Sequence, residues 1–149
     1  MPMILVFYVR HSTKASVHRS MIVEQLMTRD VITISPSTPI QDAEKIMQEK
    51  NIRRLLVVEN SKPVGIIVYR DMIGALNSPT ILKETPIEWV MTRKLVTTSP
   101  DTNVIEAIHV LRRHKINALP VIDGDKLVGI ITVVDLLHEL TRRLENDPN

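Results

Sequence analysis

The chain has 149 residues, of which 44% are hydrophobic and 24% charged, so it is long enough to bury the core of one compact domain or of two very small ones. This composition excludes an intrinsically disordered chain. The formal net charge of +2 does not argue for a polyanionic partner, although it leaves room for a local basic patch. Because there is no cysteine, disulfides, cysteine-ligated zinc, iron–sulfur clusters and thiol catalysis are excluded, and the cytoplasm is the expected compartment.

The first 20 residues read differently from the rest and are expected to form an amino-terminal extension (1–20). Residues 1–9 (MPMILVFYV) are apolar but too few to span a bilayer, which needs about twenty residues. The basic residues follow this stretch instead of preceding it, which argues against a secretory signal. Two interpretations stay open. The segment is either a strand or arm that packs on the body or on a partner subunit, or an extension translated upstream of a natural start at Met21.

An internal repeat organises the chain after residue 20. An offset of 64 residues lays residues 24–76 on residues 88–140 without a gap, and 19 of these 53 pairs are identical. Ordinary composition gives a match at about one position in fifteen, so a structural unit is duplicated. We expect the first repeat to span residues 21–84 and the second 85–149. The shared blocks are MTR (27–29, 91–93), T-x-S-P (33–36, 97–100), VGII (64–67, 128–131) and an aspartate (Asp71, Asp135).

Each repeat is predicted to begin with a short lead strand, at residues 31–34 and 95–98. A helix should follow the Ser-Pro pair, because apolar residues recur there at helical spacing. These apolar residues are Ile40, Ala43, Ile46 and Met47 in the first repeat, and Val104, Ala107, Ile108 and Leu111 in the second. Thr38 and Thr102 are expected to cap these helices, with Pro39 in the first turn.

A hairpin is predicted after this helix, because two short apolar runs flank a polar turn at residues 59–62 and 123–126. A second helix should follow, at residues 71–76 and 135–144. The order gives an α/β (α+β) unit with β-α-β-β-α topology. Since one such unit of about sixty residues buries little surface, two should pack face to face about a pseudo-twofold axis. The methionines that we expect to fill the core are Met27, Met47, Met72 and Met91.

The shared blocks resemble the CBS domain. The second repeat reads MTRKLVTTSPDTNVIEAIHVLRRHKINALPVIDGDKLVGIITVVDLL, and its motifs follow one another in the order and spacing of that family. Two copies in tandem resemble a CBS pair, or Bateman module, over residues 21–144. The resemblance implies a regulatory module that senses AMP, ADP, ATP or S-adenosylmethionine between the two repeats and signals to an effector protein. It implies no catalysis.

The best candidate site lies where the second hairpin runs into the last helix. Thr132 can donate to a phosphate oxygen, and Asp135 can accept both hydroxyls of a ribose, as acidic residues do in dinucleotide-binding folds. A helix start also presents free backbone N–H groups to phosphate. The resemblance implies that Ile130 joins this site and that the arginines face the phosphates. It also implies that the slot for the base is formed by the other repeat, at Ile32, Ile52, Arg53 and Arg54.

Alternatives that need no ligand stay open for the same residues. Thr-x-x-Asp is also a variant of the capping box, and both roles can coexist, because a cap can be shared or displaced. Arg53 and Arg54 are equally well explained as a solvated pair.

The equivalent site of the first repeat departs from this pattern. Asp71 keeps the ribose position, but Val68 stands where the second repeat has a threonine, so the phosphate contact is lost. The partner segments implied for this second site contain Val96 and Ile116, followed by Asn117. We therefore expect two unequal sites, of which the one at Asp135 is the stronger.

Other chemistry has little support. There is no P-loop, dinucleotide, nucleophile-elbow or zinc-protease motif, and the chain has only four glycines, so no enzyme, cofactor or metal site is expected. The histidines His109, His114 and His138 are expected on the surface. With 3% aromatic residues a base-stacking surface is missing, and nucleic-acid binding would depend on the basic residues 10–19 alone.

Two further expectations concern partners. We expect a homodimer through the last helix, which carries more apolar surface than docking on its own repeat requires, at Leu136, Leu137, Leu140 and Leu144. The competing hypothesis is a structural or interaction module whose ligand sites have decayed. No membrane association is expected.

Overall fold

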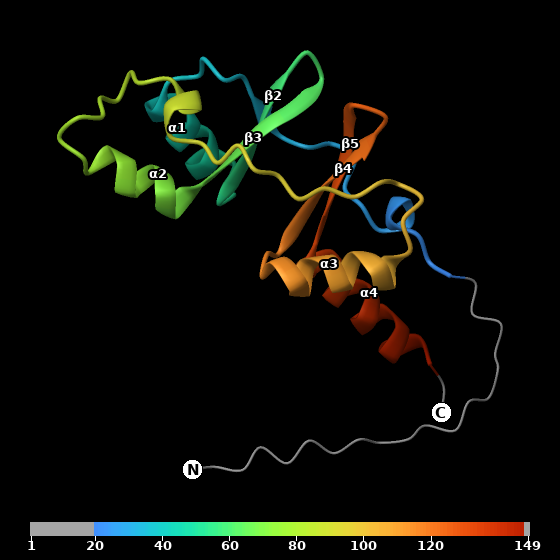
Figure 1. Cartoon of the computed structure of the whole chain (residues 1–149). Helices are drawn as coiled ribbons and strands as arrows, with labels where there is room; N and C mark the ends of the chain where they lie inside the picture. The colour runs from blue at the N-terminus through green and yellow to red at the C-terminus, as the bar shows by residue number, and fades with distance from the viewer. Residues whose placement is uncertain (1–19, 148–149) are drawn as a thin grey trace, which may run out of the picture.

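In the computed structural model, which describes residues 20–147, two repeats of helices and hairpins lie side by side (Figure 1). The elements of the first repeat are β1 (Thr33–Ile34), α1 (Ile40–Lys50), β2 (Arg54–Glu59), β3 (Lys62–Val68) and α2 (Tyr69–Leu76). Those of the second are α3 (Val104–His114), β4 (Ala118–Asp123), β5 (Lys126–Thr132) and α4 (Val133–Asn146). A short 3-10 helix lies near the start of each repeat, η1 (Val23–Gln25) and η2 (Ile87–Trp89). The predicted fold class is confirmed.

Both hairpins form where they were predicted. The strands β2 and β3 pair antiparallel, as do β4 and β5, and a β-bulge interrupts each pair at the equivalent position, after Val57 and after Val121. The first hairpin turns through Asn60 and Ser61, whose φ angles of 51° and 65° are both positive, as a type I′ turn requires. Within residues 20–147, every helix is too short or too polar to cross a membrane.

The lead strands are shorter than predicted. β1 has two residues and pairs in parallel with β2. The strand predicted at residues 95–98 is wrong, because this segment makes only an isolated bridge between Thr98 and Val121. A physical reason lies in the side chains: Ile34 is buried in the first core and anchors β1, whereas the equivalent residue of the second repeat is the polar Thr98.

The predicted caps of the first helix in each repeat are also wrong. The N-cap of α1 is Pro39, which makes no side-chain cap bond, and that of α3 is Asn103, whose side-chain oxygen accepts a backbone N–H at 2.8 Å. Thr38 and Thr102 lie one residue earlier. Their hydroxyls pair with serine hydroxyls of the preceding loop, as Thr102 does with Ser99 at 2.8 Å. The threonines therefore close the loop instead of capping the helix.

The segment that leads into each repeat packs in the core of the other repeat. Val23 and Met27 join the second core, and Ile87 and Met91 join the first. Figure 1 shows the blue segment around η1 beside the orange hairpin of the second repeat. All four predicted core methionines are buried. The boundaries at residues 21 and 84/85 stay a prediction about the sequence repeat, since the packing in space crosses them.

The backbone contacts between the repeats come as equivalent pairs, in which the 64-residue offset maps the residues of one contact onto those of the other. Thr28 exchanges two backbone hydrogen bonds of 2.9 Å with Ile130, and Thr92 exchanges two of 2.9 Å with Ile66. A half-turn that exchanges the two repeats maps one pair onto the other. The predicted pseudo-twofold axis is confirmed by this correspondence.

The glycine of each VGII block lies at this crossing. A Cβ atom on Gly129 would lie 2.7 Å from Met27 Sδ and 2.9 Å from the carbonyl oxygen of Thr28, and one on Gly65 would overlap Met91 Sδ. The glycine is needed because the methionine of the other repeat's MTR block approaches its backbone this closely. Two motifs far apart in the sequence therefore meet at one place.

Candidate functional site

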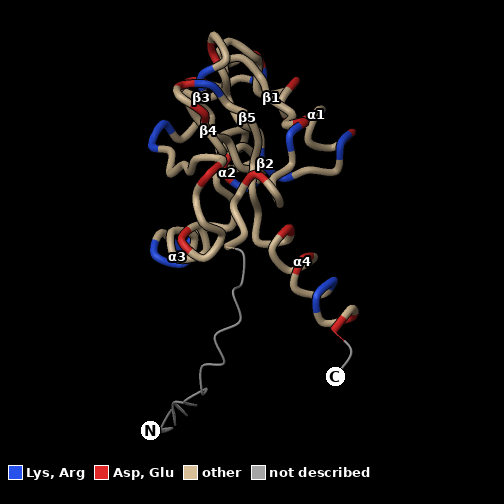
Figure 2. Tube along the Cα trace, turned by 90° about the vertical axis from the view of Figure 1, so that its right-hand side faces the viewer, with Lys and Arg blue, Asp and Glu red and all other residues tan. Residues whose placement is uncertain are grey.

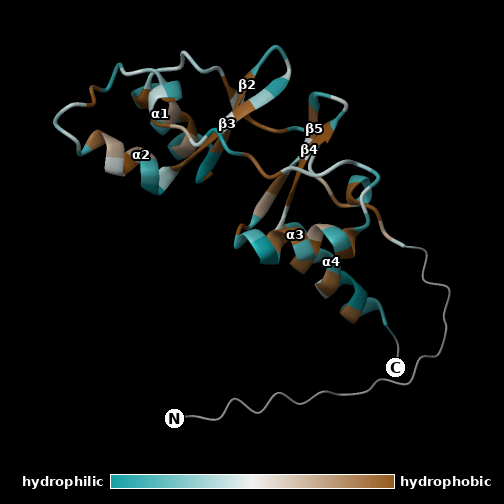
Figure 3. Cartoon of the chain, in the orientation of Figure 1, coloured by the Kyte–Doolittle hydropathy of each residue, from teal (hydrophilic) through white to brown (hydrophobic). Residues whose placement is uncertain are grey.

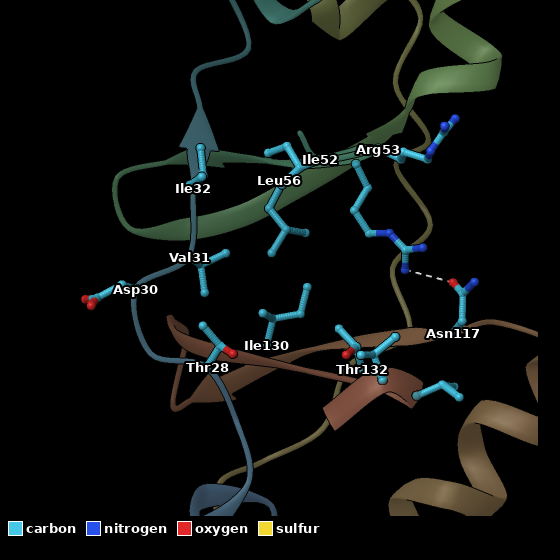
Figure 4. A pocket seen from close by; sticks show the side chains of 13 residues that line it. Thr28, Asp30, Val31, Ile32, Ile52, Arg53, Leu56, Asn117, Ile130 and Thr132 are labelled. Atoms are coloured by element: carbon cyan, nitrogen blue, oxygen red, sulfur yellow. Dashed lines mark hydrogen bonds between the residues drawn. The ribbon is translucent and has the colours of Figure 1, made fainter. Parts of the chain in front are cut away.

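A cavity of about 590 Å³ opens between the two repeats, within the size range of small-molecule sites. Four segments far apart in the chain line it: the lead-in after η1, the start of β2, the residue before β4, and the junction of β5 with α4 (Figure 4). The lining residues are Thr28, Asp30, Val31, Ile32, Ile52, Arg53, Arg54, Leu56, Asn117, Ile130, Thr132, Val133 and Val134. This set includes six of the seven residues predicted for the stronger site. The seventh, Asp135, is the hydrogen-bond partner of Thr132.

Thr132 and Asp135 form a capping box at the start of α4. The Asp135 N–H donates to Thr132 Oγ1 at 3.2 Å, and the Thr132 N–H donates to Asp135 Oδ2 at 2.7 Å. The Thr132 hydroxyl also donates to Oδ2, at 2.8 Å. The alternative interpretation of these residues as a cap is thus confirmed, and the helix starts two residues before the predicted position. Whether they also bind a ligand stays a prediction.

Apolar side chains form the walls of the cavity. In Figure 4, Ile52 and Leu56 of the first repeat lie on the opposite side from Ile130 of the second. Ile32 belongs to the lead-in segment and keeps 39% of its surface exposed. Opposed aliphatic surfaces of this kind suit a flat, weakly polar ring system such as a purine base.

The two neighbouring arginines lie differently. Arg54 Nη1 donates to Asn117 Oδ1 at 2.8 Å, across the cavity from one repeat to the other (Figure 4, dashed line). The guanidinium carbon of Arg53 instead lies 5.8 Å from the ring centre of Tyr69, a cation–π contact, and its side chain points away from the cavity in Figure 4. The interpretation as a freely solvated pair therefore does not describe Arg54.

The residues predicted for the weaker site are placed less favourably. Asp71 is exposed in the first turn of α2, where the N-cap Val68 makes no side-chain bond. Val96 and Ile116 pack against the core of the second repeat. Asn117, which was expected in this second site, lines the cavity of the first. These positions do not test whether the residues bind a ligand.

Sequence reasoning missed six of the lining residues: Thr28, Asp30, Val31, Leu56, Val133 and Val134. Thr28 carried a usable signal, because it belongs to the shared MTR block. Leu56 carried no such signal, because the sequence of a strand does not show which of its side chains will face the other repeat. In Figure 4 the carboxylate of Asp30 points outward from the cavity.

Metal binding finds no support in the part of the chain that the structure describes. No group of three or more histidine, aspartate or glutamate side chains there is arranged to hold an ion. His109, His114 and His138 are exposed, as predicted.

Comparisons with known proteins agree with this architecture. The family model of the CBS domain matches the chain twice, over residues 23–78 and 83–142. The CBS domain-containing protein YhcV of Bacillus subtilis is 32% identical over 114 residues, which cover 76% of this chain and 81% of that protein.

Two other relatives are an enzyme that this chain matches in part and a structure with bound ligands. An inosine-5'-monophosphate dehydrogenase of Thermoplasma acidophilum is 37% identical over 115 residues, but these make up 76% of this chain and only 22% of the enzyme. The crystal structure of the CBS domain pair of protein MJ0100, in complex with 5'-methylthioadenosine and S-adenosyl-L-methionine, superposes with a TM-score of 0.72 and 29% identity. The superposition covers 83% of this chain and 98% of the MJ0100 chain.

Proposed function

Since the chain belongs to the CBS domain family as a tandem pair of these domains, we propose that it is a regulatory module that binds an adenine nucleotide, AMP, ADP or ATP, between its repeats. The observation that carries this proposal is the cavity that both repeats line, with Thr132 in its lining and Asp135 hydrogen-bonded to Thr132. The related pair of MJ0100 in complex with two adenosyl compounds supports the ligand class.

The chemistry of the cavity fits the parts of a nucleotide one by one. The aliphatic walls would hold the base. Both bonds from Thr132 to the Asp135 carboxylate use Oδ2, so Oδ1 can accept a ribose hydroxyl without breaking the cap. At the start of α4 the N–H groups of Val133 and Asp135 are already hydrogen-bonded within the chain. A phosphate would therefore meet the N–H of Val134 and the positive end of the helix dipole.

A signal would follow from the position of the ligand between two bodies. A molecule that touches both repeats changes their relative angle or rigidity. A partner that binds one arrangement better than the other then responds to the ligand. No catalytic group is needed, so we expect no nucleotide turnover, and phosphate release from ATP and Mg²⁺ should stay at background.

Calorimetric titration with AMP, ADP, ATP, 5'-methylthioadenosine and S-adenosylmethionine tests the proposal. We expect micromolar or tighter binding of at least one adenine nucleotide, on protein shown to carry no ligand from expression. Asp135→Ala should weaken this binding about tenfold or more, as the loss of a charge-assisted hydrogen bond does. Asp71→Ala is the matched control at the pseudo-symmetric position and should weaken it less.

The competing function is an interaction module without a ligand. It is favoured by the capping box, in which Thr132 and Asp135 are already hydrogen-bonded to each other. A flat titration with all five compounds would favour this second function and contradict the first.

A homodimer through α4 is part of the proposal. This helix buries none of its residues completely, and Leu137, Leu140 and Leu144 are 54%, 52% and 69% exposed. Figure 3 shows hydrophobic residues recurring along the helix, and Figure 2 shows acidic and basic residues between them. A second copy of the chain would remove this apolar surface from water.

A further inference from the structure

The hydrogen bond from Arg54 to Asn117 joins the two repeats across the cavity. Arg54 is the first residue of β2, and Asn117 directly precedes β4. Both side chains line the cavity, and the donor and acceptor atoms are 2.8 Å apart. We refer to this contact as the Arg54–Asn117 bridge.

The bridge is connected to the candidate binding groups through the backbone. The carbonyl oxygen of Asn117 accepts the N–H of Val133, the first residue of α4, at 3.0 Å. The residue before Val133 is Thr132, whose hydroxyl takes part in the capping box. The side chain of Asn117 therefore holds Arg54 close to the helix start that would receive a phosphate.

The bridge has no counterpart at the pseudo-symmetric position. The 64-residue offset places Ala118 where the first repeat has Arg54, and Arg53 where the second has Asn117. An alanine side chain cannot donate a hydrogen bond, so the pair cannot recur there. The bridge therefore distinguishes one side of the pseudo-twofold axis from the other.

The resemblance to the CBS domain already implies that Arg54 faces the phosphates. We propose, on the basis of the proposed function, that Asn117 competes with the anionic group of the ligand for the Arg54 guanidinium. A neutral amide oxygen offers a single weak acceptor, whereas a phosphate takes two parallel N–H donors and carries a full negative charge. A phosphorylated ligand gains by the exchange. An uncharged nucleoside gains nothing, because it has no group that replaces the amide.

This exchange sets both specificity and regulation. Asn117 lowers the affinity for an anionic ligand, which must displace it from Arg54, and leaves the affinity for adenosine unchanged. Binding of such a ligand breaks a direct hydrogen bond between the repeats and replaces it with one that passes through the ligand. The relative position of the repeats then depends on whether the ligand carries the charge.

A double-mutant cycle with AMP and adenosine as the two probes tests this. Asn117→Ala should raise the affinity for AMP about two- to fivefold, the size of one exposed hydrogen bond, and leave adenosine unchanged. Arg54→Gln should lower AMP affinity about tenfold or more. In the double variant, Asn117→Ala should give no gain, because the competitor matters only while Arg54 is present. Arg113→Gln, exposed on α3 and outside this cavity, is the control for net charge.

The outcomes separate the inference from the function on which it rests. If wild-type protein binds AMP but Asn117→Ala raises adenosine affinity equally, or the gain persists with Arg54→Gln, Asn117 acts only by narrowing the cavity and the inference is wrong. If wild-type protein binds none of the five adenosyl compounds, the proposed function fails and the inference fails with it. Thermal unfolding of each variant shows that it is folded.

Discussion

The close approach of the lead-in segment to the hairpin of the other repeat can be tested by adding one methyl group. Gly129→Ala places a Cβ 2.7 Å from Met27 Sδ and 2.9 Å from the carbonyl oxygen of Thr28. Gly65→Ala is the matched control at the equivalent position of the first repeat. There the three nearest atoms all belong to the side chain of Met91.

The magnitude follows from which atoms can move. A methionine side chain rotates about three bonds and can swing aside. The Thr28 oxygen belongs to the backbone and accepts the N–H of Ile130 at 2.9 Å, so moving it strains the pairing between the repeats. Overpacking costs about 1–3 kcal/mol. We expect about 2–3 kcal/mol for Gly129→Ala and about 1 kcal/mol for Gly65→Ala.

Urea unfolding and the melting temperature measure the difference. For a chain of this size, Gly129→Ala should lower the melting temperature by roughly 5–10 °C, and Gly65→Ala by roughly 2–4 °C. Adding Met27→Ala to Gly129→Ala should not relieve the clash with the Thr28 oxygen. An equal or larger loss of stability for Gly65→Ala would refute the reasoning.

Three further predictions concern α4. Thr132→Ala should lower the free energy of unfolding by about 1 kcal/mol through loss of the cap, while Thr132→Ser should not; urea unfolding without a loss for the alanine variant would contradict the cap. Leu140→Glu should convert a dimer to a monomer in light scattering with little change in monomer folding, and an unchanged mass would count against the α4 interface. Hydrogen bonds from Arg142 and then Arg143 lower the pKa of Glu139 from 4.5 to about 2. Because the pKa is depressed in the folded chain, this stabilisation should be complete above pH 4.5 and disappear as the pH falls toward 2. The stability difference from Glu139→Gln, followed by circular dichroism, should shrink over that window, and a constant difference would be the contrary result.

The sequence determined the local elements and about half of the residues around the cavity. Turn chemistry and apolar spacing act over a few residues, so both hairpins and all four α-helices could be placed, with errors of a few residues at their ends. The resemblance to the CBS domain then placed Ile32, Ile52 and Ile130 at the cavity, and all three line it. The predicted cap of α3 was wrong because Asn103, the residue after Thr102, is also a good N-cap residue.

Only the tertiary structure decided how distant segments meet. Val23 and Ile87 have the same apolar pattern, and either core accepts such a side chain, so local sequence does not show that each enters the other repeat's core. The same holds for Arg54, whose neighbour Arg53 has identical chemistry. Arg54 alone reaches Asn117, 63 residues away, because the pairing of β2 with β3 and of Thr28 with Ile130 fixes the position of one repeat against the other. Contacts over such separations depend on the path of the whole chain, and no local pattern encodes them.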